Sequence, residues 1–290
     1  MFDLKTLQTL LNQQTFRFLN HTEESTIFER PNDPFASFAI DDTIATTVGQ
    51  NISPPTVRLW VHDKTLVLGI PDSRLPYIER GIEYVKDLGY NVIIRNSGGL
   101  AVLLDKGVLN LSLILPNKSE LSIHDGYELM YQFIQYLFKE YTSEIKAYEI
   151  IGSYCPGDYD LSIDGVKFAG ISQRRVRDGV AVQIYIDVEG SSKERASIVK
   201  NFYELSTANK KTTYDYPDVN PNVMGTINDL LSTNISVKEL IARIYHAISN
   251  HGSKNIQTDL LEIEREIFIK RLEQMEKRNE KIAKYLQEKI

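Results

Sequence analysis

Cys155 is the residue whose side chain could most readily do covalent chemistry, and it is the single cysteine of this 290-residue chain. A thiolate can attack a carbonyl carbon and hold an acyl group as a thioester. The cysteine stands directly before Pro156-Gly157 and follows the apolar run 148–154, which we expect to be a strand. A strand-to-turn junction would present the thiol to solvent, although a lone cysteine can equally be an inert loop residue.

Lys167 is the closest candidate in the sequence for assisting that thiol. The dipeptide Asp164-Gly165 predicts a two-residue hairpin turn,. This turn would pair Ile163 with Val166, Ser162 with Lys167, and Leu161 with Phe168. Lys167 then lies on the polar face with Asp160, where an isolated lysine would simply be solvated. Beside Cys155, its ammonium would favour the thiolate.

Two further groups of residues could contact a ligand or a partner. The turn Ser97-Gly98-Gly99 follows Arg95 and would let backbone N–H groups approach a bound molecule, although the same glycines suit any tight turn,. Arg174, Arg175 and Arg177 form a basic cluster that is either solvated or a docking point for an acidic partner,.

Several function classes find no support in the sequence. There is no Walker motif, HExxH motif, EF-hand loop or cysteine pair for zinc, and the five histidines show no ligand spacing,. We therefore expect no metal and no other cofactor. A net charge of −6 argues against a nucleic-acid partner,. The chain shows no secretory signal, lipidation motif or run of about 20 apolar residues, so we expect a cytoplasmic protein with no membrane partner,.

The elements that must position these residues alternate between helices and hairpin-linked strands. We expect helices over 4–19, 35–47, 76–88, 122–141, 191–205, 236–250 and from 259 onward,. We expect strands over 56–61 and 65–68, joined as a hairpin, and over 91–95, 100–104, 109–115, 148–154, 159–163, 166–169 and 181–188, with a second turn at Asp178-Gly179,. This mixture predicts an α+β (mixed α/β) domain over 35–250, preceded by a lead-in over 1–34 and followed by a helical extension over 251–290.

Three segments together resemble the lipoate-protein ligase and biotin-protein ligase superfamily. The stretch from Arg95 to Asp105, followed by Leu109-Asn-Leu-Ser112, resembles its signature loop and strand. Lys167-Phe-Ala-Gly170 resembles its lysine motif, and Trp60 with Val67-Leu-Gly69 resembles its first hairpin. The resemblance spans roughly residues 35–240 and implies a central mixed β-sheet with a smaller sheet, flanked by helices.

The segment from Ser153 to Arg175 resembles one branch, the cysteine octanoyltransferases, and most of all the octanoyl-[glycine cleavage H protein]:protein octanoyltransferases. That resemblance implies that Cys155 forms an acyl thioester and that Lys167 lowers the pKa of the thiol. It further implies an acyl-binding site at Arg95, Ser97, Gly98, Gly99, Ala101 and Gly170. The donor would be octanoylated glycine cleavage H protein, and the acceptors would be lipoyl domains of 2-oxoacid dehydrogenase complexes.

Three other functions remain open at this point. An octanoyltransferase that takes its acyl group from acyl carrier protein would share the cysteine and the lysine. An ATP-dependent lipoate-protein ligase would share the fold, but the chain has Leu100, Leu104 and Gly107-Val108 where ligases have glycine, histidine and Gly-Asn. The third alternative is a non-catalytic protein that keeps the fold and binds lipoyl domains without turnover.

Overall fold

The computed structural model describes residues 15–22, 26–27, 30–31, 33–117, 121–249, 254–257 and 260–286. Its strands are β1 (Thr15–His21), β2 (Thr26–Ile27), β3 (Arg30–Pro31), β4 (Thr56–Trp60), β5 (Thr65–Leu68), β6 (Asn91–Ile94), β7 (Val102–Leu104), β8 (Val108–Pro116), β9 (Lys146–Ala147), β10 (Asp160–Ile163), β11 (Val166–Val176), β12 (Gly179–Asp187) and β13 (Lys254–Gln257). Its helices are α2 (Pro34–Gly49), α3 (Ile78–Asp87), α4 (Ile123–Phe138), α5 (Ser192–Thr207), α6 (Ile227–Leu231), α7 (Val237–Ser249) and α8 (Glu262–Leu286), with short 3₁₀ turns at Pro71–Arg74 and Pro221–Val223.

The strands form one large sheet, one small sheet and the separate antiparallel pair β2-β3. The large sheet has the order β13-β1-β4-β8-β12-β11-β10-β9 and the small sheet the order β6-β5-β7. In the large sheet β13, β1 and β4 run parallel, and the other neighbours are antiparallel. Both sheets are therefore mixed, and the predicted fold class is confirmed.

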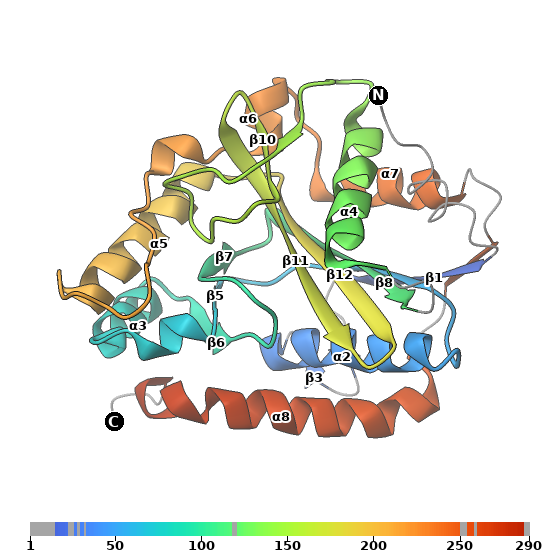
Figure 1. The fold of residues 1–290 in the computed structure, drawn as a ribbon, viewed down its shortest axis with the longest axis horizontal. Coiled ribbons are helices and arrows are strands. Elements are labelled where there is room, and N and C mark those ends of the chain that lie inside the picture. The colour runs from blue at the N-terminus through green and yellow to red at the C-terminus, as the bar shows by residue number, and fades with distance from the viewer. Residues whose placement is uncertain are drawn as a thin grey trace.

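Helices cover both faces of the large sheet (Figure 1). One face packs against α4 and α7 in an apolar cluster, and the other carries α2, the small sheet, α3, α5 and α8 in a second cluster. Alternation along β8 and β12 sends leucine, valine and isoleucine to the α4 side,. It sends Asn110, Gln183 and Tyr185 to the opposite side, where they line a cavity.

Local signals in the sequence placed most helices correctly. The side chain of Asp33 caps α2 and Pro34 opens it, while Ser191 caps α5,. Ser236 and Glu239 form a capping box at the start of α7,. These three helices and α8 confirm the expected elements.

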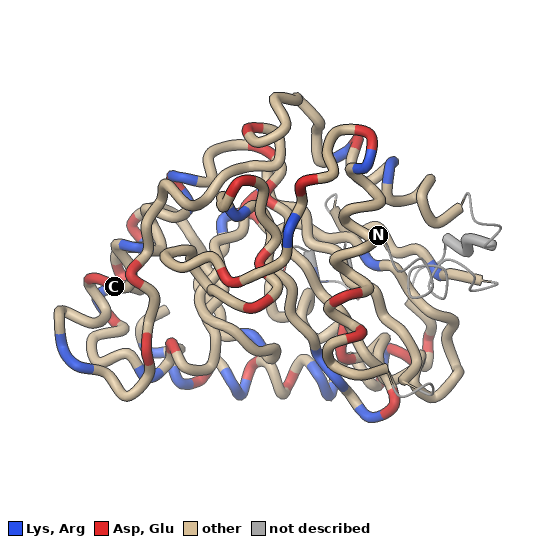
Figure 2. Tube along the Cα trace, turned by 45° about the horizontal axis from the view of Figure 1, so that its top comes forward, with Lys and Arg blue, Asp and Glu red and all other residues tan. Residues whose placement is uncertain are grey.

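The C-terminal helix α8 packs along α2 (Figure 1) and buries an apolar stripe, Phe268, Leu272, Met275 and Ile282. At its start Glu264, which is fully buried, accepts hydrogen bonds from Arg17 at 2.7 and 2.8 Å and from Thr47 at 2.9 Å. Figure 2 shows lysines and arginines interspersed with acidic residues along the chain. The apolar stripe and the buried Glu264 thus hold α8 against α2 and β1.

The predicted helix over 4–19 is wrong where the structure describes it. Residues 15–19 lie in strand β1, which pairs with β4 and β13, and residues 4–14 lie outside the described part of the chain. Phe16 and Phe18 on one side and Leu19 on the other are all buried. Burial on both faces of a sheet gives apolar residues without strict alternation, which resembles a helix pattern.

The predicted hairpin of β4 and β5 is also wrong. Both strands exist, but β4 pairs in the large sheet with β1 and β8, whereas β5 pairs in the small sheet with β6 and β7. The turn between them therefore passes from one sheet to the other, and Trp60 and Val67 come to line the cavity between the sheets.

The turn between β11 and β12 lies one residue earlier than predicted. Val176 pairs with Gly179, so the turn is Arg177-Asp178, with Arg177 at φ 53°. A Cβ on Gly179 would lie 1.8 Å from the carbonyl oxygen of Ala45 in α2. This glycine therefore serves the close approach of the strand to α2 and not the turn.

The hairpin of β10 and β11 follows the prediction for two pairs only. Ile163 pairs with Val166 and Ser162 with Lys167, but Leu161 pairs with Ala169 across a bulge and not with Phe168,. Strand β11 also runs to Val176, beyond the predicted end at Ala169.

Candidate active site

Cys155 lies in an irregular loop between β9 and β10, and not at the end of a strand. The predicted strand over 148–154 is wrong because the Asp160 carboxylate accepts hydrogen bonds from Ile150 N–H at 3.1 Å and Ser153 Oγ at 3.3 Å, which fold the segment into turns. Cys155 itself has φ 46°, in the left-handed region that costs roughly 1–2 kcal/mol for a residue with a Cβ,. Its side chain is half-buried and lines a cavity of about 430 Å³.

Two groups donate hydrogen bonds to the sulfur within the described part of the chain. Arg95 Nη2 lies 3.3 Å and the backbone N–H of Leu100 lies 3.2 Å from Cys155 Sγ. Arg95 Nη2 also donates to the carbonyl oxygen of Leu100 at 2.9 Å, which ties the two donors together. A guanidinium and an N–H aimed at one point can polarise a carbonyl that reacts there.

Gly99 makes this arrangement possible. It has φ 94°, and a Cβ there would lie 2.4 Å from Arg95 Nη2 and 2.8 Å from Cys155 Sγ. A side chain at this position would displace either the sulfur or its charged donor. The neighbouring Gly98 has no atom within 4 Å of its Cβ position, so it is under no such constraint.

Lys167 lies beneath the cysteine loop and is fully buried. Its ammonium contacts Asp160 Oδ1 at 2.8 Å and donates to Ser153 Oγ at 3.1 Å and to the carbonyl oxygens of Tyr154 and Cys155 at 2.9 and 3.0 Å. Four partners use all three of its N–H groups. The lysine therefore holds the backbone on which the sulfur stands, including the left-handed residue.

Asp160 completes this buried ion pair. Burial raises the pKa of the Asp160 carboxyl, and the Lys167 ammonium opposes that shift,. The carboxylate reaches the lysine with one oxygen and the loop at Ile150 and Ser153 with the other. One pair of opposite charges thus fixes the cysteine loop against β10 and β11.

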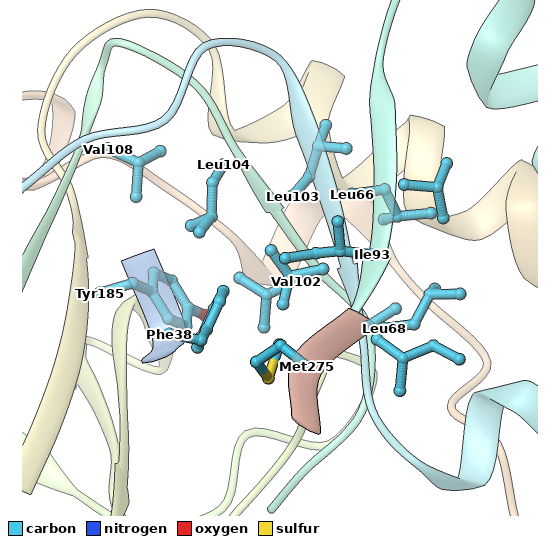
Figure 3. Close-up of a cluster of buried hydrophobic side chains, with 14 of the residues drawn as sticks. Phe38, Leu66, Leu68, Ile93, Val102, Leu103, Leu104, Val108, Tyr185 and Met275 are labelled. Carbon is cyan, nitrogen blue, oxygen red and sulfur yellow. The ribbon is translucent and has the colours of Figure 1, made fainter. Parts of the chain in front are cut away.

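The cavity above the sulfur has an apolar wall and a polar wall. The apolar wall comes from α2, β4 and the small sheet, at Phe38, Trp60, Val67, Val102 and Leu104. Figure 3 shows Phe38 and Tyr185 lying close to Val102 and Leu104. The volume of about 430 Å³ falls within the range of small-molecule sites, roughly 300–1,000 Å³, and such a wall suits an aliphatic chain,.

The polar wall of the cavity includes Gln183, and a buried hydrogen-bond network supports it. Gln183 lines the cavity and donates to Asp41 Oδ2 at 2.6 Å, which also accepts from Ser112 Oγ at 2.6 Å. The other oxygen of Asp41 accepts from Arg58 at 2.7 Å. Since every member is partnered, the network can fix the orientation of Gln183.

A family model describes most of the chain. Residues 33–249 match the lipoyl protein ligase A/B catalytic domain. The chain belongs to that family.

Relatives within the lipoyl protein ligase A/B family include transferases. The chain is 50% identical to the octanoyl-[GcvH]:protein N-octanoyltransferase of Oceanobacillus iheyensis, over 96% of this chain and 99% of that relative. It is 45% identical to the lipoyl-[GcvH]:protein N-lipoyltransferase of Listeria monocytogenes, over 94% of this chain and 98% of that relative. The predicted family and the prediction of an acyltransferase are confirmed.

Solved structures show the same fold at low identity. A bi-partite lipoate protein ligase from Thermoplasma acidophilum superimposes with a TM-score of 0.65 at 16% identity, over 96% of this chain and 99% of that one. Lipoate-protein ligase A bound with ATP gives a TM-score of 0.67 at 15% identity, over 90% and 94% of the two chains. The predicted lipoate-protein ligase fold is confirmed.

The structure brings most of the predicted site residues together. Arg95, Ser97, Gly98, Gly99 and Gly170 line the same cavity as Cys155, and Lys167 lies below its loop. Ala101 is buried behind the loop instead, where its N–H donates to the hydroxyl of Tyr203 at 3.1 Å. The roles assigned to these residues stay predictions.

Sequence reasoning missed the backbone N–H of Leu100 and the pairing of Asp160 with Lys167. Any residue but proline offers an N–H, so the type of residue 100 carries no signal. The sequence held a partial signal for the pairing, because strand alternation put Asp160 and Lys167 on one face. Nothing in the sequence showed that this face is buried.

The arginines considered for docking are largely engaged within the chain. Arg174 donates to both carboxylate oxygens of Asp42 at 2.8 and 3.0 Å, and Arg175 donates to the carbonyl oxygen of Leu121 at 2.7 Å. Arg177 is exposed at the turn. Two of the three arginines therefore already have hydrogen-bond partners within the chain.

The described ranges contain no group of three or more histidine, cysteine, aspartate or glutamate side chains placed to hold a metal ion. Within these ranges, too, every helix is too short or too polar to cross a bilayer.

Proposed function

We propose that this protein moves an octanoyl group from octanoylated glycine cleavage H protein to the lipoyl-domain lysine of 2-oxoacid dehydrogenase subunits, through a thioester on Cys155. The observation that carries the proposal is a half-buried thiol that opens into a partly apolar cavity and accepts hydrogen bonds from a guanidinium and an N–H. The relative from Oceanobacillus iheyensis is named for octanoyl transfer from this carrier.

In the first half-reaction the Cys155 thiolate attacks the carbonyl carbon of the donor's octanoyl-lysine amide. A carbon–sulfur bond forms, and the carbon–nitrogen bond breaks as the tetrahedral intermediate collapses. The donor lysine leaves as an amine and takes the proton that the thiol gave up. Negative charge develops on the carbonyl oxygen, and the Leu100 N–H and the Arg95 guanidinium are the nearest donors to the reacting sulfur,.

In the second half-reaction the acceptor lysine, as a free amine, attacks the thioester carbonyl. The carbon–sulfur bond breaks, the thiolate returns and the acceptor nitrogen loses a proton. The sequence exchanges one amide for another, so the overall reaction is close to balanced and needs no ATP. Ping-pong kinetics follow, because the donor leaves before the acceptor reacts.

Lys167 has two parts in this scheme. Its charge, below the cysteine loop, favours the thiolate, although the neighbouring Asp160 offsets that field,. Its hydrogen bonds to the carbonyls of residues 154 and 155 keep the left-handed backbone of Cys155 in place. The acyl chain extends past Gly98 and Gly99 along the wall of Phe38, Val102 and Leu104.

The transferred group can also be lipoyl. The relative from Listeria monocytogenes is named for lipoyl transfer. The cavity offers a partly apolar wall to either chain. Transfer assays with both carriers would set their relative rates.

We also propose a cellular location for the protein and limits for its catalytic domain. A catalytic thiol without a partner cysteine must stay reduced, which suits the cytoplasm,. We keep 35–250 as the catalytic unit, with β1 and β13 from the flanking segments completing its large sheet.

The experiment is a transfer assay that follows octanoyl groups on both carrier proteins by intact mass. The purified protein should move octanoyl from H protein to a lipoyl domain without ATP, and Cys155→Ala should not. Transfer only from octanoyl-acyl carrier protein would replace the donor. Dependence on ATP and free octanoate, with activity retained in Cys155→Ser, would identify a ligase, and binding without turnover would identify a non-catalytic protein.

A further inference from the structure

Arg95 and Leu100, which donate hydrogen bonds to the sulfur, stand at the two ends of one loop. We call residues 95–100 the donor loop. It contains no helix or strand and includes two glycines, so its own backbone gives it little rigidity,. A donor that must stay about 3.2 Å from a reactive atom needs support from elsewhere, because a displacement of about 1 Å can cost roughly 100-fold in rate,.

The residue just before the donor loop is held by α8. Asn279 accepts a hydrogen bond from Ile94 N–H at 2.7 Å and donates to the carbonyl oxygen of Ile94 at 3.1 Å. This side chain pairs with strand β6 as a neighbouring strand would, at the free edge of the small sheet,. Ile94 is followed directly by Arg95.

Asn279 is a polar residue at a buried position of α8 that is otherwise apolar. It lies on the buried stripe of α8 with Met275 and Ile282 and is only 4% exposed. Figure 3 shows Met275 close to Val102 of the small sheet. A buried amide on such a stripe costs free energy unless it is paired. The Asn279 amide makes two hydrogen bonds to Ile94, beside the donor loop, and donates a third to the Met275 carbonyl oxygen at 2.9 Å.

The residue just after the donor loop is held by α5. The hydroxyl of Tyr203 accepts a hydrogen bond from Ala101 N–H at 3.1 Å and donates to Asp72 Oδ1 at 2.9 Å. The second oxygen of Asp72 accepts from Gly69 N–H at 2.7 Å. Tyr203 and Asp72 are both buried, so the chain of hydrogen bonds is shielded from water,.

We propose that Asn279 and Tyr203 are positioning residues that pin the two ends of the donor loop, and so hold Arg95 and the Leu100 N–H on the sulfur of Cys155. Neither touches the reacting atoms. The inference rests on the proposed role of Cys155 and extends it to two helices that do not line the cavity. It also gives the C-terminal helix a part in the chemistry.

The test uses the pH dependence of alkylation by iodoacetamide. Cys155 is the only cysteine, so the alkylation rate of the whole protein reports on this thiol alone. Asn279→Leu keeps the number of side-chain heavy atoms and removes both hydrogen bonds to Ile94, together with the one to the Met275 carbonyl, and Tyr203→Phe removes only the hydroxyl. Each should raise the pH at half-maximal alkylation by roughly half a unit to one unit and slow octanoyl transfer about tenfold.

Two control variants disturb other contacts of the same two helices and so separate positioning from general loosening: one changes Glu264 of α8, and the other changes Tyr84 of α3, which packs on α5. Glu264→Gln disturbs the buried anchor at the other end of α8, and Tyr84→Phe removes the hydroxyl that accepts from Asn201 of α5 at 2.9 Å. Both should lower thermal stability and leave the alkylation midpoint at its wild-type value. Asn279→Ser and Asp72→Asn are milder replacements if the first pair does not fold.

The outcomes are distinct. Raised midpoints in the Asn279 and Tyr203 variants alone support the inference. Wild-type midpoints in both, a shift in only one of them, or equal shifts in the controls overturn it. Failure of the proposed function shows differently, as a wild-type protein that transfers no octanoyl group whatever its alkylation profile.

Discussion

Replacing Arg95 by methionine tests which cation acts directly on the sulfur. The guanidinium is 3.3 Å from Sγ, and a full ion pair at that distance is worth about 5 kcal/mol at an effective dielectric constant of about 20,. Loss of a hydrogen bond to a charged group typically costs less, about 1.5–3 kcal/mol, because water and neighbouring groups compensate. At 1.36 kcal/mol per unit, this corresponds to a rise of about one to two units in the pH at half-maximal alkylation.

The assay is the rate of iodoacetamide alkylation from pH 5 to 10, followed by intact mass. Arg177→Met is the matched control, because it removes an exposed arginine from the turn after β11. The Arg95→Met profile should move to higher pH, Arg95→Lys should fall between it and wild type, and the control should not move. An Arg95→Met profile that coincides with wild type would refute the direct role of this arginine.

Three other predictions follow from the same site and its surroundings. Lys167→Met should lower the free energy of unfolding in urea by about 3–5 kcal/mol, because the variant leaves the buried Asp160 carboxylate without its cation,. Adding Asp160→Asn should restore part of the lost stability, and a double variant with no recovery would contradict this explanation. Gly99→Ala should slow transfer about 100-fold, since its Cβ would meet the sulfur 2.8 Å away, whereas Gly98→Ala, with open space around its Cβ, should keep the wild-type transfer rate; an equal loss of transfer in both would count against the geometry,. Burial lowers the pKa of His62 to about 3, so the folded state disfavours its protonation, and the stabilisation present above pH 6.5 is lost as pH falls,. Between pH 7 and pH 5 this loss should be about 2 kcal/mol in urea unfolding, and His62→Phe should be less sensitive to pH over that interval; an unchanged pH dependence would rule out this cause.

Features that depend on neighbouring residues could be read from the sequence. The alternation of Gln183 and Tyr185 with apolar residues placed them on one face of β12, and that face lines the cavity. The Asp164-Gly165 turn set the register that brings Lys167 opposite Ser162. In both cases a few consecutive residues determine the geometry.

Features that depend on distant segments could not be read in this way. Gly179 looked like a turn residue, but its lack of a side chain serves contact with Ala45 of α2. Asn279 looked like one more polar residue of a charged helix, but it pairs with Ile94, far away in the sequence. Only the packed structure shows which backbone groups need such a partner.

Cys155 shows the same division. The residues alone left it open as a nucleophile or an inert loop residue, and the resemblance to cysteine octanoyltransferases gave Cys155 and Lys167 their expected roles. The direct donors to its sulfur, Arg95 and Leu100 N–H, depend on how the small sheet packs against the cysteine loop. The segment before Cys155 also has an apolar strand pattern that the buried Asp160 carboxylate overrides.

The central claim is that Cys155 carries the acyl group between two proteins. The most direct test is to mix the protein with octanoylated H protein alone, isolate it, map the adduct by peptide mass and then add a lipoyl domain. We expect one octanoyl group on Cys155 that hydroxylamine removes and that moves to the lipoyl-domain lysine. An isolated protein that bears no adduct yet still catalyses transfer, or an adduct on another residue, would contradict it.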